Sequence, residues 1–388
     1  MLRNILYFVL ILFILVSASA VSSRLWAGKE EFQPENITVT VSEGMTVAEF
    51  GKKHDLDRQV LKKVFNLTSP DDFTKQVADF GMNEELLDKR VNQAQAIQAE
   101  HESRNWFKIS LKGLLWVIFL LAVFNLIRKG RITARNRKWI YMAAACVFGI
   151  ILGSDPSPMG TVKDAIVLLG SKGVIFPPRL IAFGIFLLMV ILANKFICSW
   201  GCQIGTLQDL IFRLNRDRKD SKGLFGQIKI PFIVSNSIRI LFFLVLILVA
   251  FFRSADIIRA IDPFKIFKPQ VIGMAGGLFI GLILVLSLFV YRPWCHFFCP
   301  FGLVGWLGEK ASFFKIKVDY DKCISCRACS KACPSTVMDA ILKQDRVIPD
   351  CFSCGTCMEL CPVNAISFER GKRQIPPAGK FGQEVTSD

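Results

Sequence analysis

The thirteen cysteines carry the most distinctive chemistry in this 388-residue sequence, because thiolates ligate soft metals and metal clusters. Eight of them form two runs near the C-terminus, each with the spacing C-x2-C-x2-C-x3-C-P. The runs contain Cys323, Cys326, Cys329 and Cys333, then Cys351, Cys354, Cys357 and Cys361. Three closely spaced thiolates can surround one face of a cubane cluster, and the proline after the fourth turns the chain away.

This is the spacing of bacterial two-cluster ferredoxins, in which the fourth cysteine of each run ligates the other cluster. The spacing therefore predicts one [4Fe–4S] cluster at Cys323, Cys326, Cys329 and Cys361. It predicts a second [4Fe–4S] cluster at Cys351, Cys354, Cys357 and Cys333. The alternatives are a zinc site or a set of disulfides. Zinc takes its four thiolates from two C-x2-C pairs, so the doubled pattern favours iron–sulfur chemistry.

Four more cysteines form two C-x3-C pairs, namely Cys198 with Cys202 and Cys295 with Cys299. Each pair has a basic residue three positions before it and a glycine three positions after it: Lys195, Gly205, Arg292 and Gly302. This region is therefore an internal repeat. Two related units can bring four thiolates to one point, which suits an additional iron–sulfur or metal centre. A redox disulfide, a copper or zinc site and plain packing are the alternatives.

Three other side chains near these pairs have less specific chemistry. We expect Lys195 and Arg292 to mark the membrane edge by extending their charged ends toward water, with a secondary influence on the potential of a nearby centre. His296 lies between the second pair, either as a satisfied interfacial histidine or as a ligand or proton-transfer group. The chain has three histidines and no C-x-x-C-H run, so no haem is expected.

The apolar residues lie in runs of about twenty, the length that spans a bilayer as a helix. Mean hydropathy is +0.41 and 52% of residues are hydrophobic. Residues 1–26 read as a signal peptide or an N-terminal anchor helix. Five further spans are predicted at 109–127, 139–152, 180–197, 230–252 and 271–291. The fold class is therefore a mainly α membrane protein with about six transmembrane helices.

The formal net charge of +16 comes largely from short loops beside the apolar runs. Loops 128–138 and 213–229 are rich in lysine and arginine, so the positive-inside rule places them in the cytoplasm. Residues 27–108 and the turn-rich loops 154–178 and 253–270 are then outside. The ferredoxin region and the C-terminus are cytoplasmic. No nucleic-acid-binding motif is present, so nucleic acid is not an expected partner.

The segments outside the membrane differ in character. Residues 27–108 predict a small exported helical domain, in which Thr46 and Glu49 form a capping box, with no ligand constellation. Residues 109–312 form the transmembrane domain, ending in an interfacial helix over 301–310. Residues 313–370 predict an α+β domain for two [4Fe–4S] clusters, with strands at 313–319 and 365–368. The tail 371–388 is predicted to be disordered.

Two C-x3-C motifs at helix ends, followed by a two-cluster ferredoxin domain, resemble the membrane polyferredoxins of the NapH and NosR type. The resemblance covers residues 139–368. It implies electron transfer between the quinone pool and periplasmic or cytoplasmic reductase systems, usually within a larger complex. The sequence departs from that pattern in two ways. Gln203 follows the first pair where the family has proline, and the exported domain lacks a flavin-attachment motif.

These observations predict a multi-pass protein of the cytoplasmic (inner) membrane that carries electrons. Electrons would pass between the quinone pool, or a membrane redox subunit, and a redox partner through cytoplasmic [4Fe–4S] clusters. The chain would be an electron-transfer subunit of an oxidoreductase such as a quinol dehydrogenase complex, surrounded by membrane lipid, and no side chain is assigned a catalytic role. One alternative is copper reduction or cofactor assembly for a respiratory enzyme. Another is a scaffold whose exported domain recruits a partner.

Overall fold

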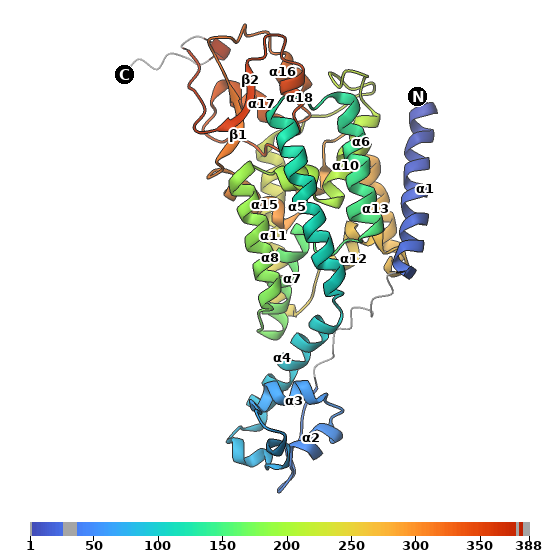
Figure 1. Cartoon of the computed structure of the whole chain (residues 1–388), viewed down its shortest axis with the longest axis vertical. Helices are drawn as coiled ribbons and strands as arrows, with labels where there is room; N and C mark the ends of the chain where they lie inside the picture. The colour runs from blue at the N-terminus through green and yellow to red at the C-terminus, as the bar shows by residue number, and fades with distance from the viewer. Residues whose placement is uncertain (1, 26–36, 378–379, 383–388) are drawn as a thin grey trace.

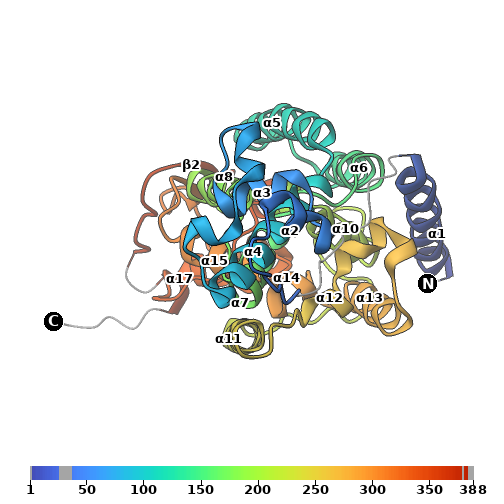
Figure 2. The same ribbon diagram turned by 90° about the horizontal axis from the view of Figure 1, so that it is seen from below.

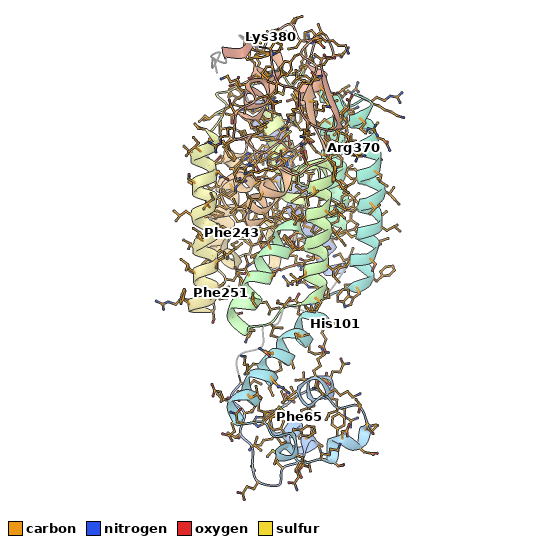
Figure 3. The ribbon with its side chains drawn as sticks, turned by 90° about the vertical axis from the view of Figure 1, so that its left-hand side faces the viewer. Phe65, His101, Phe243, Phe251, Arg370 and Lys380 are labelled. Carbon is orange, nitrogen blue, oxygen red and sulfur yellow. The ribbon has the colours of Figure 1, made fainter. Side chains whose placement is uncertain are left out.

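The computed structural model describes residues 2–25, 37–377 and 380–382. Three parts follow one another along the long axis of the molecule (Figure 1). A small helical domain lies at one end, a helical bundle in the middle, and the cysteine-rich C-terminal domain at the other end. Figure 3 shows the same order through Phe65 in the small domain, Phe243 and Phe251 on the bundle, and Arg370 and Lys380 in the C-terminal domain.

The described part of the small domain contains five helices: α2 (Val47–Lys53), α3 (Arg58–Phe65), the 3-10 helices η1 (Pro70–Thr74) and η2 (Val77–Phe80), and α4 (Glu84–Glu102). The predicted capping box at the start of α2 is confirmed. The Glu49 backbone N–H donates to Thr46 Oγ1 at 3.3 Å, and the Thr46 backbone N–H donates to Glu49 Oε2 at 3.0 Å. Val47, Phe50 and Leu87 are fully buried in the core of this domain.

Three helices among the described residues are long and apolar enough to cross a membrane: α1 (Leu2–Leu25), α5 (Trp106–Arg128) and α11 (Phe232–Arg253). They stand at the periphery of the bundle, with α10 (Gln203–Leu214) between them (Figure 2). Two shorter apolar helices are α8 (Pro177–Ala193) and α13 (Met274–Leu286). A further predicted span forms α6 (Ala134–Ala144), which continues as the π-helix η3 (Ala145–Ile151).

The prediction of a turn-rich loop at 154–178 is wrong, because helix α7 (Pro158–Lys172) fills most of it. Ser157 caps this helix by accepting the Gly160 N–H at 3.1 Å, and Pro158 occupies the first helical position, where its missing N–H costs nothing. Helix α7 packs tightly on α11, since a Cβ on Gly170 would lie 2.8 Å from the Ala250 carbonyl. Loop 253–270 likewise contains short helices: α12 (Ile258–Ile261), η4 (Pro263–Phe267) and η5 (Pro269–Val271).

The internal repeat is visible in the backbone. In one unit α8 leads to α9 (Phe196–Trp200) and α10; in the other α13 leads to α14 (Pro293–Phe297) and α15 (Pro300–Glu309). Cys202 and Cys299 are the N-cap residues of α10 and α15, with nearly equal backbone angles (φ −73° and −72°, ψ 123° and 116°). The helix predicted at 301–310 is present as α15, but it packs between α7 and α8 with Phe301 buried and so belongs to the bundle.

The C-terminal domain has a two-stranded antiparallel sheet of β1 (Phe314–Val318) and β2 (Ile366–Arg370), as predicted. Three short helices complete it: α16 (Ala328–Ala332), α17 (Val337–Lys343) and α18 (Thr356–Glu359). The described part of the tail contradicts the prediction of disorder. Lys380 Nζ donates to the Tyr320 and Cys323 carbonyls at 3.1 and 3.3 Å, and Phe381 is buried.

Candidate iron–sulfur sites

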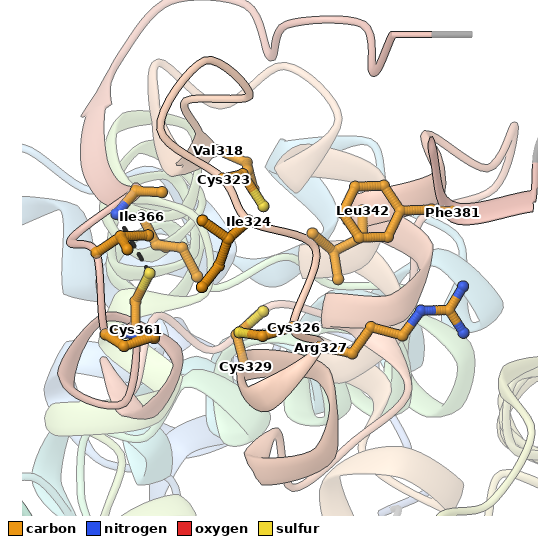
Figure 4. A pocket seen from close by; sticks show the side chains of 13 residues that line it. Val318, Cys323, Ile324, Cys326, Arg327, Cys329, Leu342, Cys361, Ile366 and Phe381 are labelled. Carbon is orange, nitrogen blue, oxygen red and sulfur yellow. Dashed lines mark hydrogen bonds between the residues drawn. The ribbon is translucent and has the colours of Figure 1, made fainter. Parts of the chain in front are cut away.

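The first cavity of the C-terminal domain is lined by the cysteines that the spacing assigned to one cluster (Figure 4). They are Cys323, Cys326, Cys329 and Cys361. Most of the other lining residues are apolar, among them Leu342 and the tail residue Phe381, and Arg327 also lines the cavity. This cavity lies near the surface, since Cys326 is exposed and Ile324 is 62% exposed.

The second cavity is lined by the other predicted set, Cys333, Cys351, Cys354 and Cys357. Its wall also includes Tyr291 from the bundle. Each cavity therefore combines three cysteines of one run with the fourth cysteine of the other, as crossed ligation requires. All thirteen cysteines lie in the described part of the chain as free thiols.

The grouping of the thiols bears on whether a site holds one ion or a cluster. Within the described residues, no three or more histidine, cysteine, aspartate or glutamate side chains are grouped closely enough to hold one metal ion. Zinc binds sulfur at about 2.3 Å, so its four thiolates crowd around one point. A cubane cluster holds its ligand sulfurs farther apart. The residues lining each cavity fit a cluster in ligand type and number, since each set has four cysteines.

The cysteines differ in how readily they ionise, and ionisation matters because the thiolate is the ligand. Burial raises the pKa of Cys329 to about 12. Burial also acts to raise the pKa of Cys354, but Arg213 and Arg137 outweigh it and lower that pKa below its usual value. Two arginines of the bundle thus favour the thiolate form of a cysteine in the second cavity.

A buried ionic network fastens the second cavity to the bundle. Arg137 of α6 contacts the Asp220 carboxylate at 2.5 Å, the Glu359 carboxylate at 3.0 Å and the Cys354 carbonyl at 3.0 Å. Glu359 also accepts the Ala134 N–H at the start of α6 at 2.6 Å. Arg213 of α10 pairs with Asp220 and donates to Thr356 Oγ1 at 3.3 Å. The sequence predicted these basic residues only as orientation signals.

The two C-x3-C pairs meet in the bundle. Their thiols interact electrostatically, Cys198 with Cys202 and Cys299, and Cys295 with the three others. Glycine is required beside each pair, because a Cβ on Gly205 would lie 2.2 Å from the Cys198 carbonyl oxygen, and one on Gly302 would lie 2.6 Å from that of Cys295. The structure thus brings together the four cysteines that the repeat predicted to converge.

Lys195 and Arg292 do not extend toward water, because both are fully buried. Instead each joins its own repeat unit to the other one. Lys195 Nζ donates to the Gly302 carbonyl at 2.5 Å, and Arg292 Nη1 donates to the Cys198 carbonyl at 2.8 Å. Buried carboxylates, Asp350 and Asp209 respectively, compensate their charges, which is the condition under which a buried cation is tolerated.

The residue that departs from the resemblance has a structural role. Gln203 is fully buried at the first position of α10, where Pro300 stands in the second unit. Its Nε2 donates to the Phe148 carbonyl in the π-helix at 3.2 Å. The wider π turn leaves backbone carbonyls without their usual hydrogen-bond donors. The glutamine amide can donate to one of them, whereas a proline side chain has no donor.

Aromatic side chains connect the C-x3-C pairs with the second cavity, and the sequence alone did not single them out. The Phe352 ring lies 4.6 Å from the Arg292 guanidinium, and its centroid is 5.5 Å from that of His296. His296 Nδ1 lies 3.1 Å from the Arg292 carbonyl oxygen. Trp200 Nε1 donates to the Ser353 carbonyl at 3.3 Å. The only feature of the sequence that could have indicated a role for Phe352 is that it directly follows a predicted ligand cysteine, Cys351.

Comparison with protein families identifies two kinds of iron–sulfur domain in the chain. A 4Fe-4S dicluster domain matches residues 315–362, which implies two [4Fe–4S] clusters. A 4Fe-4S binding domain matches twice, at residues 175–221 and 272–318. These two segments contain the two repeat units, each with its C-x3-C pair.

The chain is distantly homologous to ferredoxin-type proteins. It is 31% identical over 176 residues to the putative electron transport protein YccM of Escherichia coli, covering 42% of this chain and 48% of YccM. It is 29% identical over 157 residues to the ferredoxin-type protein NapH of E. coli, covering 39% and 51%. The match to the uncharacterized protein MJ0749 of Methanocaldococcus jannaschii is 26% over 216 residues, covering 55% and 78%.

The chain thus spans about half the length of YccM and NapH. No solved structure matches it.

Proposed function

We propose that this chain is a membrane-anchored iron–sulfur electron-transfer protein of the NapH and YccM type. The observation that carries the proposal is the pair of cavities, each lined by four cysteines in the crossed arrangement. Cys323, Cys326, Cys329 and Cys361 would hold one [4Fe–4S] cluster, and Cys351, Cys354, Cys357 and Cys333 the other. A bound cluster supplies reversible one-electron transfer, and the surrounding charges and solvent exposure set its potential.

The four buried thiols of the C-x3-C pairs would form a third centre, hereafter the bundle centre. It consists of Cys198, Cys202, Cys295 and Cys299. The Phe352 ring, which lines the second cavity and lies against Arg292, provides a short packed route from this centre to the second cluster. The first cluster, with its exposed Cys326, would exchange electrons with a partner at the surface.

The proposal includes an orientation in the cytoplasmic membrane. Six spans, assembled from α1, α5, α6 with η3, α8, α11 and α13, would leave both ends and the ferredoxin domain in the cytoplasm. The units would be the anchor 1–26, the exported domain 27–108, the membrane domain 109–312, the ferredoxin domain 313–370 and the tail 371–388. The basic loops 128–138 and 213–229 support this orientation.

The partner on the bundle side would be a quinone, or a membrane redox subunit of a respiratory complex. In that setting the chain would serve as an electron-transfer subunit of an oxidoreductase.

Metal analysis of the protein purified without oxygen tests the proposal. Two cubane clusters require about eight irons per chain, with reducible signals in electron paramagnetic resonance (EPR) spectra. Iron in excess of that is expected from the bundle centre, and it should disappear in Cys198→Ser and Cys295→Ser. Cys146→Ser, a half-buried thiol outside every site, is the matched control and should keep the full iron content. Substantially fewer than eight irons in the unmodified protein would contradict the proposal.

Copper handling is the second candidate function, because soft thiolates in a buried site suit Cu(I). Cys198→Ser separates the two: loss of copper binding with quinol-linked electron transfer intact would support copper handling, and the reverse would support the electron carrier.

A further inference from the structure

A buried carboxylate lies between the bundle centre and the second cluster site. Asp350 is 1% exposed and directly precedes Cys351. Its Oδ1 pairs with Lys195 Nζ, and its Oδ2 accepts from Arg239 Nη1 at 2.9 Å. Lys195 lies between α8 and α9, whereas Arg239 belongs to α11. One carboxylate of the ferredoxin domain therefore forms ion pairs with cations from two separate parts of the bundle.

The two cations that hold Asp350 also face the bundle centre. Lys195 interacts electrostatically with the Cys198 and Cys299 thiols, and Arg239 interacts with Cys299. Lys195 Nζ donates in addition to the Gly302 carbonyl, at the start of the helix that Cys299 caps. On the other side of the carboxylate, the Cys351 N–H donates to Glu309 at 3.0 Å. The two cations therefore lie between the bundle thiols and the Asp350 carboxylate, and this carboxylate adjoins the second cluster loop.

We propose that Asp350 is a positioning residue that acts as a counter-charge for both the bundle centre and the second cluster, and so sets their potentials together. This inference rests on the proposed function. Net charge near a cluster is one of the factors that set its potential, and charges in a buried, weakly polar region act strongly on one another. Without the carboxylate, Lys195 and Arg239 are uncompensated, and the more positive surroundings favour the reduced, more negative state of each centre.

The first cluster provides an internal reference. None of Asp350, Lys195 and Arg239 lines its cavity, which is bordered by exposed residues where water screens charge. A change confined to the buried charges should therefore leave its potential unchanged.

The test is a potentiometric titration, followed by EPR, of the full-length protein in detergent with its clusters loaded. Asp350→Asn should shift the potentials of the second cluster and the bundle centre upward, while the first cluster stays in place. Arg239→Gln removes a positive charge and should shift the same two potentials downward. Asp350→Glu keeps the charge and should restore the unmodified values. A purely structural role would not produce shifts of opposite sign in two variants of one ion pair.

Shifts of the same sign in Asp350→Asn and Arg239→Gln, or an equal shift at the first cluster, would overturn the inference. If Asp350→Asn loses iron, the downward shift in Arg239→Gln still decides the question. An iron content of about eight, without the bundle centre, would contradict the third centre of the proposed function. The second cluster would still report on Asp350 in that case, so the two failures are distinguishable.

Discussion

The two cluster loops have nearly the same backbone but opposite surroundings. Ser325 and Ser353 occupy the same position in their runs with φ of 57° and 49°, and Arg327 and Gly355 follow with φ of 56° and 80°. The first loop faces solvent, whereas the second is covered by α6 and α10. Gly355 lies close to the bundle, since a Cβ added at this position would lie 3.8 Å from the Ile132 side chain. A duplicated motif has thus acquired one surface site and one site enclosed by the bundle.

The residue after the first cysteine of each run shows the difference most directly. Ile324 is 62% exposed and Phe352 is 5% exposed. Phe352 lies against Tyr291 and Arg292 of the bundle. Contacts outside the motif, and not the motif itself, therefore make the second site part of the bundle.

The largest effect is expected from Asp220→Asn, which keeps the side-chain shape and tolerates the positive φ at this position. Arg137 and Arg213 would lose their shared partner in a buried site, and breaking a buried pair costs about 3–5 kcal/mol. Chemical denaturation in detergent should show this loss. Asp321→Asn, at an exposed position near the first cavity, should change stability by less than about 0.5 kcal/mol. Equal losses in the two variants would contradict the proposed difference between the sites.

A matched pair at the equivalent loop positions should give the next largest difference. Phe352→Ala removes a buried aromatic side chain and is expected to cost about 3 kcal/mol. Ile324→Ala removes an exposed side chain and is expected to cost less than about 0.5 kcal/mol. Unfolding free energies of the loaded protein measure both. A larger loss in Ile324→Ala would mean that the first cavity is the one held by tertiary contacts.

The smallest of the three effects is expected within the bundle. Gly205→Ala forces a Cβ against the Cys198 carbonyl oxygen. That oxygen accepts a hydrogen bond from Arg292, whose guanidinium packs on the Phe352 ring. Such overpacking costs about 1–3 kcal/mol, and the EPR line shape of the second cluster should change while that of the first does not. Gly184→Ala on α8 is the control, because no atom lies within 4 Å of its added Cβ. A change confined to the first cluster would contradict coupling through Arg292.

The sequence allowed more to be predicted about chemistry than about packing. Cysteine spacing indicated two crossed ligand sets, and the cavities contain those sets. The capping box at Thr46 and strand β1 also followed from local patterns. Helix α7 was missed, although Ser157 and Pro158 form a recognisable start, because its short length and the turn-rich residues before it suggested a loop. Burial of Lys195 and Arg292 was missed because each is compensated by a carboxylate distant in the sequence.

The sequence by itself indicated which thiols belong together, since three cysteines of each set lie in one short loop and the doubled motif takes the fourth from the other run. It also determined the apolar helices and the repeated C-x3-C units. Only the tertiary structure decided that the second cluster loop is enclosed by the bundle and that Asp350 pairs with Lys195 and Arg239 of the bundle. These features depend on charges more than a hundred residues apart, such as Lys195 and Asp350. No local pattern specifies such pairs, because they form only when the two domains pack together.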